Sequence, residues 1–221
     1  CLGLWVGVWG PPPQSPIPNP QSPSISIVNI IFYIKFILDL NFIYKMDSWG
    51  AFIQNYLVNN VHGETTVYGA CEHGALLGPD GTVWASTEGF SLNTSSSIEV
   101  AKDDGSTEKT TINEFDHIVD AVKNKGDTTK MKKGGVHFMG SKWVVLDGYQ
   151  GEDYYTQYFK KSEGGAAVTI TSKGNVVIGT FNSGREAVLL KDGNQKKIKQ
   201  SVGNCNNAVD DLSKVLVSSG L

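Results

Sequence analysis

The sequence has few of the residues that would indicate a disulfide framework, a metal site or a phosphate-binding loop. Its 221 residues include three cysteines, widely spaced at Cys1, Cys71 and Cys205. This odd and scattered set favours a reducing, intracellular compartment. The four histidines show no metal-ligand spacing, so we expect neither a structural metal nor a cofactor. The sequence also contains no nucleotide-binding glycine motif and no internal repeat.

The chain also lacks the excess of positive charge that is typical of nucleic-acid-binding proteins. Its formal net charge is −3 at pH 7 and its isoelectric point is near 5.8. Without residues 1–45 the 19 basic residues become 17 and the 22 acidic residues become 21, which leaves −4. We therefore expect no nucleic-acid partner. A hydrophobic content of 40% suits one globular domain with an appendage.

Residues 1–45 differ in composition from the rest of the chain. Residues 11–23 are proline-rich and favour extended polyproline II structure. Residues 25–44 form an apolar run of roughly membrane-spanning length, but each of its two charged side chains would cost about 2.5–3.5 kcal/mol at the centre of a membrane helix. No methionine precedes Met46. We interpret 1–45 as translated upstream sequence, with a membrane anchor or a self-binding proline tail as alternatives.

The first half of the region 46–221 contains signals for both helices and strands. Apolar spacing predicts a helix over 48–59, and small and apolar residues predict a buried strand over 67–77. A Pro-Asp-Gly turn leads into another strand at 83–86. An Asp104-Gly105 turn predicts a hairpin over 98–111. The sequence Thr111-Ile112-Asn113-Glu114 then fits a capping box that opens a second helix.

The second half is dominated by strand signals. They lie at 135–139, 142–146, 154–159, 166–171 and 175–181. Short connections between them favour antiparallel pairing. A protruding hairpin is expected over 187–201, followed by a closing helix that starts near Gly203. The predicted fold class is therefore α+β.

Three short segments together carry a resemblance to a known family. They are Trp49 and Phe52 in the first helix, the strand that contains Trp84, and the start of the closing helix from Gly203. In this order and spacing, 46–221 resembles the profilins. The resemblance implies an antiparallel sheet with the N- and C-terminal helices on one face and a further helix on the other. It also implies a cytoplasmic, non-enzymatic protein that binds monomeric actin and regulates its polymerisation in the cytoskeleton.

The resemblance assigns a proline-binding surface to five positions. Profilins use aromatics at the positions of Trp49, Phe52 and Trp84 to bind proline-rich proteins such as formins. The family usually has Tyr at Phe52, and polar aromatic residues at the positions of Val215 and Leu221. These departures predict weakened or altered proline binding. The alternative is that both tryptophans only pack the terminal helices against the sheet.

The resemblance also places actin contacts on the later strands and at the start of the last helix. The matching positions are Lys142, Val145, Lys160, Lys161, Gly203, Asn206 and Asp211. Actin is acidic, so lysines here would steer its approach, although each lysine alone also fits an ordinary solvated charge. The predicted hairpin near 183–202 is basic, and we hypothesise that it supplements actin binding, with an anionic lipid headgroup as the alternative ligand. Phosphoinositides are known ligands of the family.

The hairpin over 98–111 resembles the extra acidic arm of alveolate-type profilins. Two other classes of function are kept beside the actin-binding one. A small-ligand-binding sensory α+β module would need a cavity inside the sheet. An enzyme would need an activated nucleophile, and the sequence has no nucleophile elbow. Cys205, near a helix start, is the one candidate thiol, and a buried, unreactive cysteine is the alternative interpretation.

Overall fold

The computed structural model describes residues 49–62, 64–102, 104–125, 127 and 135–221. The interpretations of residues 1–45 as upstream sequence, membrane anchor or proline tail lie outside the described residues. Within the described ranges, none of the helices is long and apolar enough to cross a membrane.

The centre of the domain is a seven-stranded antiparallel sheet in the order β4-β3-β11-β10-β9-β8-β7. Its strands are β3 His73–Leu77, β4 Val83–Ser86, β7 Val136–Phe138, β8 Ser141–Gln150, β9 Tyr154–Lys161, β10 Gly164–Thr171 and β11 Val176–Asn182. The five strand signals of the second half are confirmed as consecutive neighbours. Short turns between them allow each strand to fold back on the one before it.

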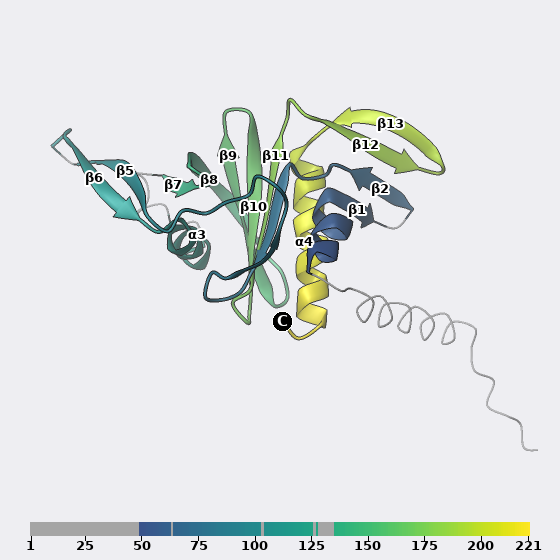
Figure 1. Ribbon diagram of the computed structural model, residues 1–221, viewed down its shortest axis with the longest axis horizontal. Coiled ribbons are helices and arrows are strands. Elements are labelled where there is room, and N and C mark those ends of the chain that lie inside the picture. Colours follow the sequence, from purple (N-terminus) through teal and green to yellow (C-terminus); the bar gives the residue numbers. More distant parts are fainter. Residues whose placement is uncertain (1–48, 63, 103, 126, 128–134) are drawn as a thin grey trace, which may run out of the picture. The chain divides into compact units, whose positions relative to one another are not determined.

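The side chains of this sheet alternate between its two faces and contribute to two separate hydrophobic cores. In β10, Ala167 belongs to a first cluster, whereas Ala166 and Val168 belong to a second cluster. Helix α4 (Val202–Ser218) contributes to the first cluster and helix α3 (Glu114–Lys123) to the second. Since successive strand residues face opposite ways, the two helices cover opposite faces of the sheet, as Figure 1 shows. The predicted α+β arrangement is confirmed.

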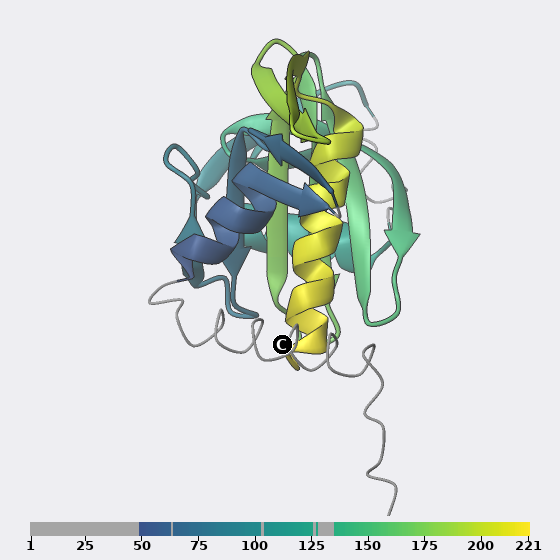
Figure 2. The ribbon, with the colours of Figure 1, turned by 90° about the vertical axis from the view of Figure 1, so that its right-hand side faces the viewer.

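The N-terminal helix lies beside α4. It begins as the short α2 (Gly50–Phe52) and continues as a π-helical turn, η1 (Ile53–Val58). Ile53 and Leu57 are fully buried in the same cluster as α4, and Figure 2 shows the two helices side by side. The predicted helix over 48–59 is therefore present between Gly50 and Val58, with a wider turn than expected.

A second sheet of four strands runs β1-β2-β12-β13. It contains β1 Asn59–His62, β2 Thr65–Tyr68, β12 Glu186–Lys191 and β13 Asn194–Lys199. The single strand predicted over 67–77 is wrong, because Gly69 turns the chain at a φ of +74° and places β2 and β3 in different sheets. The hairpin predicted over 187–201 is confirmed as β12–β13.

The protruding arm is a two-stranded hairpin of β5 (Ser96–Ala101) and β6 (Thr107–Ile112), as predicted. The predicted capping box is wrong. Thr111 lies in β6, and the N-cap of α3 is Asn113, whose side chain accepts from the Phe115 amide at 3.0 Å.

Glu114 instead holds the base of the arm against the turn between β7 and β8. Its carboxylate, only 1% exposed, accepts hydrogen bonds of 2.9–3.3 Å from Asn93, Ser96, Met139 and Gly140. Burial alone would raise the pKa of Glu114, but these hydrogen bonds outweigh it and lower the pKa below its usual value.

Candidate functional site

Four aromatic rings form a continuous row along the N-terminal helix and β4, and we call them the aromatic row. The Trp49 ring lies 5.1 Å from the Trp84 ring and 5.4 Å from the Phe52 ring, measured between centroids. The Phe52 ring lies 6.1 Å from that of Tyr56, at an interplanar angle of 20°. The row therefore joins β4 to η1 through contacts between rings.

Helical spacing and one glycine bring these rings together. Trp49, Phe52 and Tyr56 are three and four positions apart, so they share one face of the helix. Trp84 reaches them from β4 across Gly78, where a Cβ would stand 3.0 Å from the indole nitrogen. All four rings are only partly buried against the first cluster. They pack the terminal helix on the sheet and still present aromatic surface to solvent.

Trp49, Phe52, Trp84 and Leu221, four of the five predicted proline-site residues, pack against this same cluster. Leu221 is held there by its amide, which donates to the Leu216 carbonyl at 3.0 Å. Val215 is half-buried on α4. The predicted proline-binding positions do not include Tyr56, although its spacing of four from Phe52 was the available signal.

A second surface lies on the side of the large sheet that α4 covers. Tyr158 packs into the first cluster, so Lys160, two positions later, faces the same way. Val144 pairs with Lys160 across β8 and β9, and Lys142 shares its side. Val144 is 60% exposed. Tyr149 is 51% exposed and lies on the same side, because the register shifts between Val145 and Gly148 and Tyr149 pairs with Thr156, two positions before Tyr158. We call Lys142, Val144, Tyr149 and Lys160 the outer strand face.

Two predicted actin-contact residues are on the other side of the same strands. Val145 pairs with Phe159 and packs against the second cluster. The Lys161 ammonium lies 4.7 Å from the centroid of the Trp143 ring, which is also part of that cluster. Because the period of a strand is two, Lys160 and Lys161 cannot share one surface. The structure therefore does not bring Val145 and Lys161 together with Lys142 and Lys160.

Helix α4 extends the outer strand face. Gly203, Asn206 and Asp210 follow a spacing of three and four, so they share one side of the helix. The Tyr154 hydroxyl on β9 donates to Asp210, which shows that this side faces the outer strands. Lys214 also pairs with Asp210, with nitrogen and oxygen 2.6 Å apart. Burial, together with the hydrogen bond to Asp210, raises the pKa of Tyr154.

Asp211 points to the other side of α4. Its carboxylate accepts a hydrogen bond from the side-chain amide nitrogen of Asn60 at 3.0 Å and lies 3.1 Å from Nδ1 of His62. Both partners belong to β1, and Asn60 is only 2% exposed. Asp211 therefore joins α4 to the small sheet, and the structure separates it from Gly203 and Asn206. Val215, four positions later, lies on this same side of the helix.

The β12–β13 hairpin carries five cations and two anions, Glu186 and Asp192, between residues 185 and 199, so it is locally positive. Part of this positive charge is paired with acidic side chains of the same domain. Arg185 pairs with Glu72 at 2.8 Å, and Lys197 pairs with Glu186 at 3.3 Å. The Lys199 ammonium donates to the Gly184 carbonyl at 2.9 Å.

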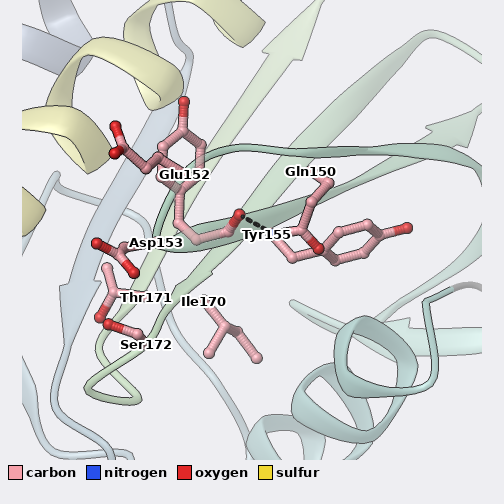
Figure 3. A pocket seen from close by; sticks show the side chains of 8 residues that line it. Gln150, Glu152, Asp153, Tyr155, Ile170, Thr171 and Ser172 are labelled. Atoms are coloured by element: carbon pink, nitrogen blue, oxygen red, sulfur yellow. Dashed lines mark hydrogen bonds between the residues drawn. The ribbon is translucent and has the colours of Figure 1, made fainter.

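A shallow depression of about 280 Å³ lies at the end of the large sheet (Figure 3). Its walls come from the β8–β9 and β10–β11 turns and include Glu152, Asp153, Thr171 and Ser172. The depression is outside the sheet, whereas a sensory module of the kind considered above needs a cavity within it. Among the described residues, no cluster of His, Cys, Asp and Glu is arranged to hold a metal ion.

Comparisons with known proteins agree with this architecture. The family model described as Profilin matches residues 47–221. The chain is also similar to Profilin-2 of Acanthamoeba castellanii, with 23% identity over 173 residues. That alignment covers 78% of this chain and 98% of the relative.

Proposed function

The chain belongs to the profilin family, whose members bind actin monomers and regulate polymerisation, and from this premise we propose that it binds monomeric actin one-to-one. The contact surface is the outer strand face together with Gly203 and Asn206 of α4. Profilins are non-enzymatic, and we propose no catalytic role. The site of action that follows is the cytoplasm and its actin cytoskeleton.

The chemistry of the outer strand face supports this proposal. The exposed Val144 lies opposite Lys160 across β8 and β9 and two positions from Lys142, and the exposed Tyr149 lies further along β8 on the same side. An apolar centre bordered by charged side chains is the usual composition of a protein interface. Actin is acidic, so the lysines would accelerate its approach and fix its orientation. This pairing of exposed apolar and basic side chains is the single observation that carries the assignment of the surface.

The β12–β13 hairpin is a further part of the proposed actin surface. It is locally basic in a domain whose net charge is negative, so it complements an acidic partner. Hairpin lysines that contact actin would make binding depend more strongly on salt. A loss of phosphoinositide binding without a loss of actin binding, after replacement of these lysines, would assign the hairpin to lipid instead.

We propose proline-rich proteins, such as formins, as ligands of the aromatic row. Flat, partly exposed rings suit the stiff polyproline II helix, which loses little conformational entropy on binding. The Phe52 ring retains stacking area but lacks the hydroxyl that the family usually has there. Binding is therefore expected to be weaker than that of a row with Tyr at this position.

Two neighbouring lysines test the actin surface. We expect Lys160→Glu to weaken binding of actin monomers at least about tenfold, because a negative charge would face an acidic partner. Lys161→Glu makes the same change in charge one position away, on the opposite side of β9, and should alter the affinity by less than about twofold. The measurement is inhibition of pyrene-actin assembly by the full chain, with thermal unfolding to confirm the fold.

Equal losses of affinity in the two variants would show that the outer strand face is not the contact surface. If the full chain leaves actin assembly unchanged even in excess, the proposal of actin binding is wrong.

A further inference from the structure

Two thiols that are far apart in the sequence meet in the first core cluster. Sγ of Cys71 lies 3.5 Å from Sγ of Cys205, and both cysteines are free. Cys71 lies in the turn between β2 and β3, and Cys205 lies in the first turn of α4, 134 positions later. The two side chains are 3% and 0% exposed, respectively.

Hydrogen bonds hold the backbone around this pair, and the space around the sulfurs depends on a glycine. The Cys71 amide donates to the Leu57 carbonyl and the Cys205 amide to the Ser201 carbonyl. The side-chain amide of Gln200 donates to the Gly69 carbonyl at 2.9 Å, which ties the β2–β3 turn to the start of α4. A Cβ at Gly179 would stand 3.0 Å from the Cys71 sulfur and 3.4 Å from the Cys205 sulfur.

We propose that Cys71 and Cys205 are a redox site that closes to an intramolecular disulfide when the protein meets a peroxide. The Cys71 thiolate attacks one peroxide oxygen, which breaks the O–O bond, forms a sulfenic acid and releases hydroxide. The hydroxide takes up the proton that the thiol lost and becomes the first molecule of water. The Cys205 thiol then attacks the sulfenic sulfur, forms the S–S bond and releases water. In total the two thiols lose two electrons and two protons, and hydrogen peroxide is reduced to two molecules of water.

Formation of the disulfide shortens the distance between the two sulfurs from 3.5 Å to about 2.05 Å. Side-chain rotation and small backbone shifts can supply this change. The hydrogen bond with Cys205 and burial together raise the pKa of Cys71, so the thiol form dominates at neutral pH. Oxidation is therefore slow while the core is closed, and it proceeds when the β2–β3 turn opens. Such a site responds to sustained oxidation rather than to brief exposure.

The disulfide would lock the start of α4 to the β2–β3 turn. Cys205 lies between Gly203 and Asn206, the helix positions of the proposed actin surface. The closed loop of more than a hundred residues restricts the unfolded chain, and a reductant reverses the bond. The site itself does not rest on actin binding, so a failure of that proposal would leave it intact.

The test uses the full chain with Cys1→Ser, so that only the two core thiols can react. After incubation with hydrogen peroxide and alkylation of remaining thiols, we expect a peptide that links Cys71 to Cys205 in a monomer that has lost two hydrogen atoms. Thermal unfolding should shift upward by about 5–15 °C, and dithiothreitol should reverse the shift. The matched controls Cys71→Ser and Cys205→Ser should show neither change.

Two outcomes would overturn the proposal. One is that both thiols can still be alkylated after oxidation, even when the oxidation is carried out at a denaturant concentration that opens the core but does not unfold the chain. The other is that oxidation yields only sulfinic acids or disulfides between molecules. The peptide map separates these products directly, and it remains informative where a serine variant folds poorly.

Discussion

At the scale of single residues, Glu114 shows how a charged side chain can organise a junction. Five hydrogen bonds from two segments converge on its carboxylate, and they hold both the base of the arm and the β7–β8 turn. An isolated two-stranded hairpin is marginally stable in water, so its position depends on this anchor. Both carboxylate oxygens accept hydrogen bonds, so the fold requires the ionised form of Glu114.

We expect Glu114→Gln to destabilise the domain by about 2–4 kcal/mol at pH 7, since an amide nitrogen would face backbone donors in a buried site. Asp116→Asn, in the same helical turn but exposed, is the control and should cost less than about 1 kcal/mol. Urea unfolding monitored by circular dichroism measures both. Equal effects would mean that only the charge near the helix start matters.

The same variants test the pH dependence. The folded pKa of Glu114 is lowered, so its stabilisation is fully present above the unfolded value of about 4.3 and is lost as pH falls through the folded pKa. The free energy of unfolding of the parent protein should therefore decrease more steeply in acid than that of Glu114→Gln. Parallel pH profiles would contradict this origin of acid sensitivity.

At the scale of elements, α4 separates the two proposed surfaces. One side, with Asn206 and Asp210, faces the outer strands. The other side, with Asp211 and Val215, faces β1. The core side between them carries Cys205, Leu212 and Leu216. Because one helix contributes to both proposed surfaces, the proposal places actin and a proline-rich ligand on different sides of the domain.

This separation predicts that the two activities can be removed independently. We expect Trp84→Ala to reduce retention on immobilised polyproline by about tenfold or more, because the row loses the large indole ring that packs on Trp49 at its β4 end. Tyr149→Ala, which removes an exposed aromatic ring on the outer strand face, should leave retention unchanged and weaken actin binding. If Trp84→Ala binds polyproline as the parent does, the row only packs the helix on the sheet.

The change Phe52→Tyr should increase polyproline affinity by a few fold, since it restores a hydroxyl that can bond a peptide carbonyl. Unchanged affinity would show that this position does not contact the ligand through its ring edge.

At the scale of the whole molecule, two clusters on opposite sides of one sheet form the core. All their described buried members lie between Ile53 and Leu216. A region of this length can bury enough apolar surface to fold as an independent domain. We propose that the domain starts at Met46, one residue before the range that the family model matches.

We expect a chain that starts at Met46 to unfold within about 2 °C of the full chain and to bind actin monomers with the same affinity within about twofold. Thermal denaturation and the actin assembly assay measure these two properties. A large loss of either would show that residues before Met46 are needed by the domain. Increased affinity for proline peptides after truncation would instead indicate that residues 11–23 compete for the aromatic row.

The sequence by itself determined the fold class, the meander of strands and the arm, because periodicity and turn residues act over a few positions. The hairpin predicted around Asp104-Gly105 and the hairpin predicted over 187–201 both form, and the spacing of Trp49 and Phe52 placed them on one helix face. The family resemblance depended on the same local segments.

Only the tertiary structure decided which residues share a surface. Strand alternation separated Lys160 from Lys161, and a contact with β1 turned Asp211 away from Asn206. Glu114 fitted a local cap, yet donors from distant segments outcompeted that role. The pairing of Cys71 with Cys205 spans most of the domain, so no local pattern could reveal it. Contacts of this kind arise when elements pack, and their partners are chosen by the whole fold.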